Sequence, residues 1–394
     1  MSTLPKQATE HVKRLIRSDW DALDLAEIEK SPLISDDAGA ETVALTVARK
    51  ARTTDERLIF NLDTLTHVSR LDLEPFLLEK ITWRGEAWHV GSFLLPRELR
   101  CGAGFLPMQG WDPSIGQDRA TWKKKMSESI PLQPLKETSF GLSVLALPGA
   151  TPSPHTDEVD PTYLLQGSVE EISFTSTTFD IPMKVAVYTP PRPAEDIAFI
   201  SDGQICLNDV SLLPALESAQ TDGTIPPTTC VFFAPAAAKD RSRVLGDPDK
   251  LAGFLRTEVL EILRDRSIAH TAESTTIVGA SLGGFAAANI VLDAPDLVKN
   301  AIVQSAALWW PDREFETLAK YRETQDFDLG ITIFHEVGSL EPYLLHENRE
   351  FAQILQERQI THLSREYCGG HDYVCWRAGI IDGLAWIAAN RSPA

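Results

Sequence analysis

Residues 275–288 read TTIVGASLGGFAAA. A short β-branched run ends in Gly-x-Ser-x-Gly, and a helix-forming segment of small residues follows at once. This layout predicts a strand that turns sharply into a helix and presents the hydroxyl of Ser281 above the sheet. Gly279 and Gly283 flank the serine, where a tight turn leaves no room for a Cβ. The stretch therefore predicts a nucleophilic serine; the alternative is a glycine-rich turn with a purely structural role.

Composition limits the kinds of protein that this chain can be. It has 394 residues, of which 43% are apolar and 24% charged, enough for one large α/β domain and a smaller second unit. The net charge of −19 argues against nonspecific binding to nucleic acid or to an anionic membrane. We therefore expect neither as a partner, and an anionic substrate would need a local cluster of arginines.

The cysteines and the N-terminus bear on cofactors and location. Five cysteines form an odd number without a CxxC spacing, which is typical of reduced thiols and not of a disulfide framework or a zinc site. We expect no metal or other cofactor. The first thirty residues hold no signal-peptide core, and no stretch reaches the ~18 apolar residues of a membrane span. A cytoplasmic protein is expected, and nothing in the sequence predicts its oligomeric state.

Patterning divides the N-terminal part into three segments. Residues 1–35 look like an amphipathic helix, with apolar residues on one side and charges elsewhere. Residues 36–110 show short alternating runs separated by turn residues, which predict a small antiparallel β-sandwich. Residues 111–165 are rich in Pro, Lys, Ser and Thr, and we expect an irregular connecting arm.

From residue 166 to residue 394, strand-like and helix-like segments alternate. The expected strands are 169–175, 184–188, 196–200, 228–233, 275–278, 301–304, 330–336 and 362–367. The expected helices are 209–219, 251–264, 284–292, 313–322, 346–357 and 376–389. This alternation predicts a mostly parallel sheet covered by helices on both faces. With the serine turn, it indicates an α/β-hydrolase fold preceded by a small β-sandwich domain.

A serine hydroxyl needs a base to act as a nucleophile at neutral pH. In this fold the chain order is serine, acid, histidine, with the histidine after the last strand. Of nine histidines, His371 has that place, and Gly369 and Gly370 let its loop turn back toward the serine. The alternative is that Asp372 caps the last helix and His371 is incidental.

The acid should follow the preceding strand. Glu336 at the strand's end is the first candidate, and Glu341 a few residues later is the reserve. Either carboxylate could instead bind substrate or form a structural ion pair.

An oxyanion formed at the substrate carbonyl needs two N–H donors. One is expected from Leu282, directly after the nucleophile, because helix N-termini carry free N–H groups and a positive dipole end. The other is expected from the loop after an early strand, at Gly203 and Gln204, where glycine lets the backbone come close. A simple turn is the competing interpretation of that loop.

Five motifs together resemble the enterochelin esterase family, whose members hydrolyse ferric siderophores. They cover the chain from about residue 165 to the C-terminus and keep the family's order and spacing. The motifs are Asp202-Gly203-Gln204, residues 279–284, residues 304–310, residues 336–342, and Gly369-Gly370-His371-Asp372 with Trp376-Arg377. Residues 88–96 and 105–107 are similar to the end of that family's Ig-like N-terminal sandwich.

The resemblance implies an esterase that opens the seryl ester bonds of a catecholate trilactone siderophore, often with iron bound, so that the metal can be released. The iron would arrive with the substrate. A ferric tris-catecholate is anionic and aromatic, so guanidinium groups and flat rings suit it. The candidate substrate-binding residues are Arg241, Arg243, Trp309, Trp310, Trp376 and Arg377. Core packing is the alternative for the tryptophans, and a solvated loop for Arg241 and Arg243.

Two other functions stay open on the sequence. The first keeps the same catalytic residues in an esterase or acyltransferase of the broader esterase-D-like group, acting on another acyl ester or thioester. The second is a catalytically inactive hydrolase domain that binds a ferric catecholate.

Overall fold

The structure is a computed structural model, and it describes most of the chain. The described residues are 12–36, 39–109, 112–132, 137–139, 141–157, 163–311, 315–324 and 330–391. The chain forms two compact units. The first unit contains Met1–Pro161, Ser339–Pro342 and Cys368–Cys375, and the second contains Thr162–Gly338, Tyr343–Tyr367 and Trp376–Ala394.

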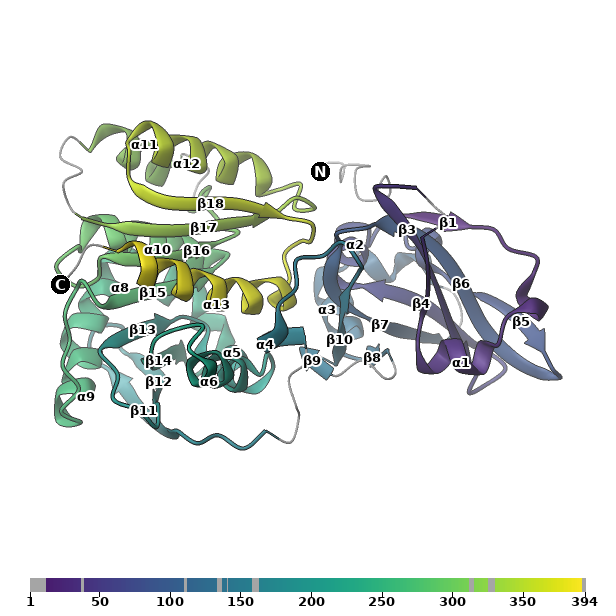
Figure 1. The fold of residues 1–394 in the computed structure, drawn as a ribbon, viewed down its shortest axis with the longest axis horizontal. Coiled ribbons are helices and arrows are strands. Elements are labelled where there is room, and N and C mark those ends of the chain that lie inside the picture. The colour runs from purple at the N-terminus through teal and green to yellow at the C-terminus, as the bar shows by residue number, and fades with distance from the viewer. Residues whose placement is uncertain are drawn as a thin grey trace. The chain divides into compact units, whose positions relative to one another are not determined.

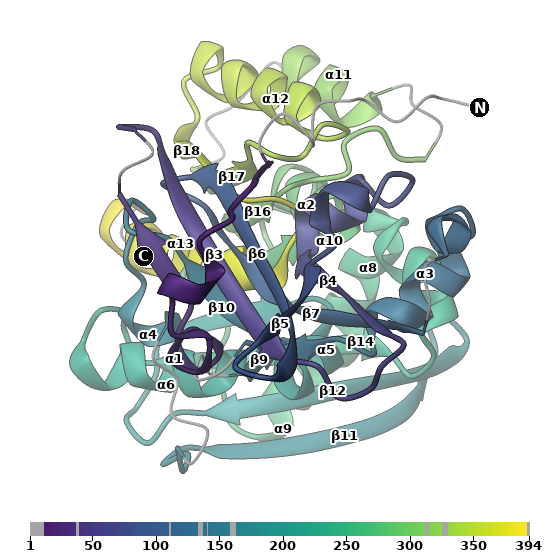
Figure 2. The same cartoon turned by 90° about the vertical axis from the view of Figure 1, so that its right-hand side faces the viewer.

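The first unit is built from two antiparallel five-stranded sheets. One has the order β1-β6-β3-β2 with β5 beside β6, and the other has the order β4-β7-β10-β9 with β8 beside β7. Figure 2 shows β3 alongside β6 and β4 alongside β7. The strands are β1 Lys13–Leu15, β2 Leu33–Ser35, β3 Thr42–Lys50, β4 Glu56–Leu62, β5 Glu79–Trp83, β6 Glu86–Pro96, β7 Arg100–Gln109, β8 Ile130–Pro131, β9 Glu137–Ser139 and β10 Leu142–Ala146. The helices are α1 Leu25–Lys30, α2 Asp63–Val68, α3 Arg119–Met126 and α4 Pro154–Asp157.

The prediction of one amphipathic helix over residues 1–35 is wrong for the part that the structure describes. Lys13–Leu15 forms β1, which pairs antiparallel with β6, and only α1 is α-helical. Pairing with a sheet edge and burial of Trp20 and Ile28 against the sandwich outweigh a weak local helical pattern. Residues 1–11 of that expected helix lie outside the described residues.

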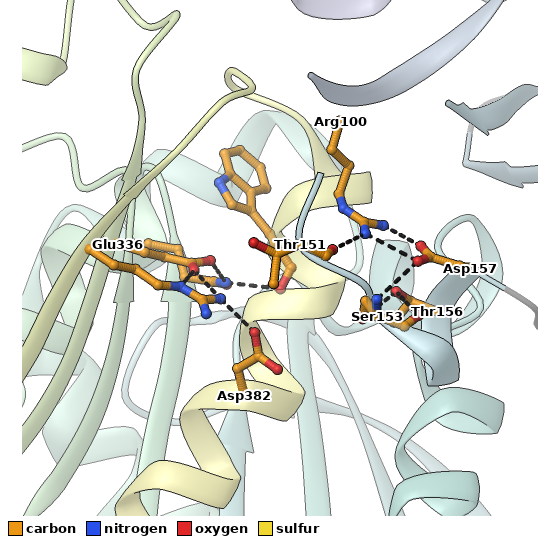
Figure 3. A network of polar contacts seen from close by, with 10 residues as sticks. Arg100, Thr151, Ser153, Thr156, Asp157, Glu336 and Asp382 are labelled. Atoms are coloured by element: carbon orange, nitrogen blue, oxygen red, sulfur yellow. Dashed lines mark hydrogen bonds and ion pairs between the residues drawn. The ribbon is translucent and has the colours of Figure 1, made fainter. Parts of the chain in front are cut away.

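The segment 111–165, expected to be an irregular arm, contributes ordered elements to the sandwich. Strands β8 and β10 pair with β7, and α3 buries Trp122 completely in the same core. The indole Nε1 of Trp122 donates to His67 Nδ1 at 3.1 Å. Helix α4 is held by Arg100, whose guanidinium pairs with Asp157 (Figure 3). Strands β8 and β10 form because they pair with β7, which lies outside this segment. The local pattern of turn residues does not predict such pairing.

The second unit is an eight-stranded sheet in the order β11-β12-β14-β13-β15-β16-β17-β18 (Figure 1). The first two pairings, β11–β12 and β12–β14, are antiparallel, and every later pairing is parallel. The strands are β11 Ser168–Ser176, β12 Ile181–Thr189, β13 Asp196–Ile200, β14 Thr228–Pro235, β15 Thr275–Ala280, β16 Asn300–Gln304, β17 Thr332–Gly338 and β18 Thr361–Tyr367. The α-helices are α5 Gly203–Asn208, α6 Leu212–Asp222, α7 Arg241–Leu245, α8 Pro248–Phe254, α9 Leu260–Asp265, α10 Leu282–Asp293, α11 Glu316–Glu323, α12 Leu345–Glu357 and α13 Tyr373–Asn390, with a π-helical turn at Leu255–Val259.

Helices cover both faces of this sheet because both faces are apolar. Along β16, Ala301 and Val303 join the cluster that contains residues of α8 and α10. The intervening Ile302 points to the other face, where its side chain approaches Gly383 of α13. Alternation along a strand thus gives three layers, as expected for a doubly covered parallel sheet. Among the described residues, no helix is both long and apolar enough to cross a membrane.

The buried His335 on β17 gives the second unit a pH-dependent stability. Its ring is 1% exposed and contacts Asn348 Oδ1 through Nε2 at 3.1 Å. Burial lowers the pKa of His335 from 6.5 to about 4. Between these values the unfolded chain binds a proton that the folded one excludes, so the free energy of unfolding falls as the pH drops from 6.5 to 4.

We expect this loss to be on the order of 1 kcal/mol per pH unit, measurable by urea unfolding at pH 7 and pH 5. A His335→Gln variant should show a shallower dependence. An unchanged slope in that variant would mean that other groups, such as the half-buried His67 and the buried His89, account for it; desolvation also lowers their pKa values to about 4.

Candidate active site

Ser281 lies at the junction of β15 and α10, as the sequence predicts for a nucleophile elbow. Its backbone has φ 59° and ψ −118°, a region that non-glycine residues rarely adopt. Such a conformation costs on the order of 1–3 kcal/mol and persists only where the surroundings enforce it. Backbone strain at this serine is a physical sign of a functional position.

Strand β16 and the segment that follows it hold the elbow in place. Ser281 N donates to Gln304 O at 2.9 Å, and Ser281 O accepts from Ala307 N at 3.0 Å. The amide of Phe285 also donates to Ser281 O at 3.0 Å, which closes the first turn of α10. The strained residue is therefore bonded on both sides, and its half-buried side chain is left at the end of the parallel strands.

The glycines of the elbow are required by close packing. A Cβ at Gly279 would overlap the carbonyl group of Gly283, and a Cβ at Gly283 would overlap the Ser201 hydroxyl. We expect Gly279→Ala to lower the free energy of unfolding by about 1–3 kcal/mol and to reduce ester hydrolysis, because the elbow must shift.

Gly253 on α8 provides a matched control for that substitution. Its nearest neighbour to an added Cβ is Thr178 Cγ2 at 3.9 Å. Gly253→Ala should therefore stabilise the protein by about 0.5–1 kcal/mol without affecting activity. Urea unfolding and ester turnover check both variants, and an active Gly279→Ala protein of normal stability would contradict the packing argument.

His371 is paired with a carboxylate inside the first unit. Its Nδ1 lies 2.6 Å from Glu341 Oε2. Glu341 is 4% exposed, whereas the His371 side chain is 42% exposed. A carboxylate can only accept here, so Nδ1 carries a proton, and in the neutral imidazole Nε2 then keeps its lone pair. This is the tautomer that a general base requires.

Glu336, the first candidate for the acid, has other partners. Its Oε1 accepts from Gln304 Nε2 at 2.7 Å and its Oε2 accepts from Arg365 Nε at 2.9 Å. Arg365 also pairs with Asp382 on α13 at 2.7 Å, and Figure 3 draws Glu336 and Asp382 in this network. Burial raises the pKa of Glu336, which is fully buried, while the Arg365 guanidinium opposes that shift. Glu336 therefore takes part in a structural ion pair, and the carboxylate in contact with His371 is that of the reserve candidate, Glu341. The role of Glu341 as the catalytic acid stays a prediction.

The loop expected to supply the second oxyanion donor follows β13. Asp202 has φ 54°, and Gly203 begins α5 directly after it. A Cβ on Gly203 would lie 2.7 Å from Phe233 N, so the position demands glycine. Gln204 is half-buried, and its Oε1 lies 3.4 Å from Lys184 Nζ. On the other side, Leu282 is the first residue of α10. The roles of Leu282, Gly203 and Gln204 as oxyanion donors stay predictions.

Comparison with known proteins places the chain in a family. Residues 176–387, more than half of the chain, match the model of a family described as "Putative esterase". The chain belongs to this esterase family. The span contains Ser281, Glu336, Glu341 and His371.

Curated relatives of this esterase are siderophore esterases by name. The iron(III) enterobactin esterase of Dickeya dadantii strain 3937 is 27% identical over 240 residues, which are 56% of this chain and 55% of that protein. The alignment thus spans about half of that relative's length. The iron(III) enterobactin esterase of Escherichia coli strain K12 is 25% identical over 280 residues, 68% of this chain and 69% of that protein.

Solved structures share the fold of this protein along almost the whole chain. The enterobactin esterase of Shigella flexneri, crystallised in the presence of enterobactin, has a TM-score of 0.77 at 21% identity and covers 95% of this chain and 98% of that one. The ferric enterobactin esterase of Salmonella typhimurium has a TM-score of 0.77 at 20% identity and covers 95% and 99%. The predicted fold class and the resemblance to the enterochelin esterase family are confirmed.

The arginines expected to bind substrate differ in their surroundings. Arg241 makes a bidentate pair with Asp202, with Nε–Oδ1 at 2.5 Å and Nη2–Oδ2 at 2.6 Å. Arg243 is exposed and donates from Nη2 to Phe179 O at 2.5 Å. Arg377 is 1% exposed and donates to Val210 O at 2.8 Å. Arg377 is therefore packed in the protein interior. Arg241 and Arg243 stay candidates for contact with an anion.

The tryptophans divide in the same way. Trp376 is 3% exposed, and its Nε1 donates to Ser305 Oγ at 3.1 Å, so it packs within the second unit. Trp310 is half-buried and donates from Nε1 to Gly246 O at 3.2 Å. The ring of the half-buried Trp309 lies 6.1 Å from that of Trp310. For Trp376 the core-packing alternative holds, and Trp309 and Trp310 stay candidates for contact with an aromatic ligand.

Two polar residues of the site region were not singled out as functional by the sequence. The Tyr367 hydroxyl, at the end of β18, lies 3.2 Å from Ser305 Oγ. The sequence suggests a helix cap for Asp372, and in the structure its carboxylate also accepts from Gly102 N on β7. Its place beside His371 in the Gly-Gly-His-Asp motif was the available signal. In the described part of the chain, no group of three or more His, Cys, Asp or Glu residues is arranged to hold a metal ion.

Proposed function

We propose that this chain is a serine esterase that hydrolyses the ester bonds of a catecholate trilactone siderophore such as enterobactin. The observation that carries the proposal is Ser281, held at φ 59° between β15 and α10. Membership of the esterase family supports ester hydrolysis. The relatives named as iron(III) enterobactin esterases support the substrate class.

In the first half of the reaction, the Ser281 hydroxyl attacks a lactone carbonyl. His371 Nε2 takes the hydroxyl proton, and Glu341 stabilises the resulting imidazolium through Nδ1–H. The negative charge on the carbonyl oxygen is received by the N–H groups of Leu282 and of the Gly203–Gln204 segment. The C–O bond to the departing seryl oxygen then breaks, and His371 gives that oxygen its proton. The products are an acyl-enzyme and a free serine hydroxyl on the opened substrate.

The second half repeats the same proton path with water. His371 removes a proton from a water molecule as the oxygen attacks the acyl carbon. When the tetrahedral intermediate collapses, His371 returns the proton to Ser281, and the carboxylic acid leaves. No redox step and no metal of the enzyme's own is needed on this proposal; any iron enters and leaves with the siderophore.

A ferric catecholate trilactone is an anion, and the chain carries a net charge of −19. Attraction must therefore be local. The groups we propose for contact with the ligand are the guanidinium groups of the half-buried Arg241 and the exposed Arg243, and the rings of Trp309 and Trp310. The cytoplasmic location expected from the sequence is part of this proposal, and cell fractionation with an antibody to the chain checks it.

A product profile with purified protein tests the function. Enterobactin, with and without Fe(III), and p-nitrophenyl acetate would be offered separately, and the trilactone products followed by reversed-phase chromatography. We expect the trilactone to be converted to linear catechoyl-serine products. Labelling of Ser281 by a fluorophosphonate probe identifies the nucleophile by mass spectrometry. Turnover of the aryl ester alone would refute the substrate class, and failure of both reactions would refute the esterase.

A further inference from the structure

The base loop, defined here as Cys368–Cys375, is part of the first unit although it follows the last strand of the second. The acid segment Ser339–Pro342 belongs to the first unit as well. The two segments are bonded to each other by Leu340 N to Gly369 O at 3.0 Å and by the His371–Glu341 pair. Leu340 is also a member of the core cluster of the β-sandwich. The catalytic base and its acid are therefore packed with the N-terminal sandwich.

The attachment point is the beginning of β7. Strand β4 pairs with β7 only as far as Leu62, which lies opposite Ala103. Beyond that point the backbone of β7 bonds to the base loop instead. Arg100 N donates to Cys368 O at 2.9 Å, and Gly102 N donates to Asp372 Oδ2 at 2.5 Å. Arg100 O accepts from Cys375 Sγ at 3.3 Å. Both ends of the base loop are thus fastened to a core strand.

Asp372 is the side chain that joins the loop to the strand. Its Oδ1 accepts from Val374 N at 2.9 Å, which caps the start of α13, while its Oδ2 accepts from Gly102 N. The carboxylate is 3% exposed. Each carboxyl oxygen thus accepts from one backbone N–H, and burial keeps water from competing for these two hydrogen bonds. The residue before it is His371, so the same two bonds limit how far the imidazole can move.

We propose that Asp372 is a positioning residue for His371, through which the N-terminal β-sandwich holds the catalytic base in place. The inference rests on the proposed function in that His371 must be the general base. It does not depend on which ester is hydrolysed.

The substitution Asp372→Ser separates the two tasks of the carboxylate. Serine is also a good helix cap, so the bond to Val374 N is retained, but its single short hydroxyl cannot also reach Gly102. We expect kcat for p-nitrophenyl acetate to fall about 10- to 100-fold while KM stays within about twofold, because misplacement of a base by ~1 Å has effects of that size. The concentration of competent enzyme is taken from fluorophosphonate titration.

Asp118→Ser is the matched control. Asp118 caps α3 in the same unit through Thr121 N at 2.7 Å and is exposed. The same substitution there should leave kcat unchanged. If Asp372→Ser fails to fold, the variant Asp372→Asn, which has nearly the same volume, takes its place. Asparagine keeps one oxygen acceptor and presents an N–H₂ group to the other donor, so one of the two bonds is still lost.

A double-mutant cycle with Glu341→Gln distinguishes positioning from a general loss of stability. Both residues act through His371, so their effects on kcat should not be additive. The fold loss in kcat caused by Glu341→Gln should be at least about threefold smaller in the Asp372→Ser protein than in the wild type. Additive effects, or a lowered melting temperature with unchanged kcat, would overturn the proposal. Enzyme that turns over p-nitrophenyl acetate but not the trilactone would refute the substrate class and leave this test intact. Enzyme that turns over neither would refute the esterase and the positioning role together.

Discussion

Replacing Ser281 with alanine is expected to lower kcat for ester hydrolysis by at least about 10³-fold. Without the hydroxyl no acyl-enzyme forms, and only binding and oxyanion stabilisation of direct attack by water remain. Turnover of both the trilactone and p-nitrophenyl acetate should be measured, because the nucleophile is common to both reactions. The fluorophosphonate probe should no longer label the protein.

The backbone at Ser281 allows a sharper version of this experiment. Because φ is 59°, a side chain is strained here, and Ser281→Gly should be as inactive as Ser281→Ala but more stable by about 1 kcal/mol. Ser267 serves as a control, since it is an exposed serine with φ 57° outside the candidate site. Ser267→Ala should retain full activity. A Ser281→Ala enzyme with more than a tenth of the wild-type kcat would refute the mechanism.

Glu341→Gln is expected to lower kcat by about 10²- to 10⁴-fold, with little effect on the free energy of unfolding. An amide in place of the carboxylate can donate to Nδ1 and so favours the wrong tautomer of His371, and it no longer stabilises the imidazolium. The 2.6 Å contact between Glu341 Oε2 and His371 Nδ1 is the basis for this expectation. Steady-state kinetics together with urea unfolding measure both consequences.

Glu336→Gln is the matched comparison, with the same change of carboxylate to amide only five positions earlier. Here we expect kcat to change less than about tenfold, and the free energy of unfolding to fall by about 1–3 kcal/mol, because the half-buried Arg365 guanidinium loses one of its two carboxylates. The reverse result, with an inactive and stable Glu336→Gln enzyme and an active Glu341→Gln enzyme, would return the acid role to Glu336.

The choice between these two carboxylates shows what spacing along the chain can and cannot decide. Both lie where the acid is expected, just after the same strand, and the sequence offers no measure of which side chain turns toward the histidine. The answer depends on partners far away in the chain. Glu336 is bonded to Gln304 and Arg365 in the second unit. Glu341 comes directly after Leu340, which packs in the core of the first unit.

The sequence by itself determined the elements whose signals are local. Hydrophobic strands, the Gly-x-Ser-x-Gly turn at Ser281 and the glycines before His371 all encode their geometry within a few residues, because backbone conformation responds to immediate steric demands. Only the tertiary structure decided the rest: that residues 13–15 form a strand, that Trp376 and Arg377 are buried, and that Asp372 bonds to β7. These outcomes depend on burial and pairing between residues as many as 270 positions apart, and such contacts leave no periodic trace in the sequence.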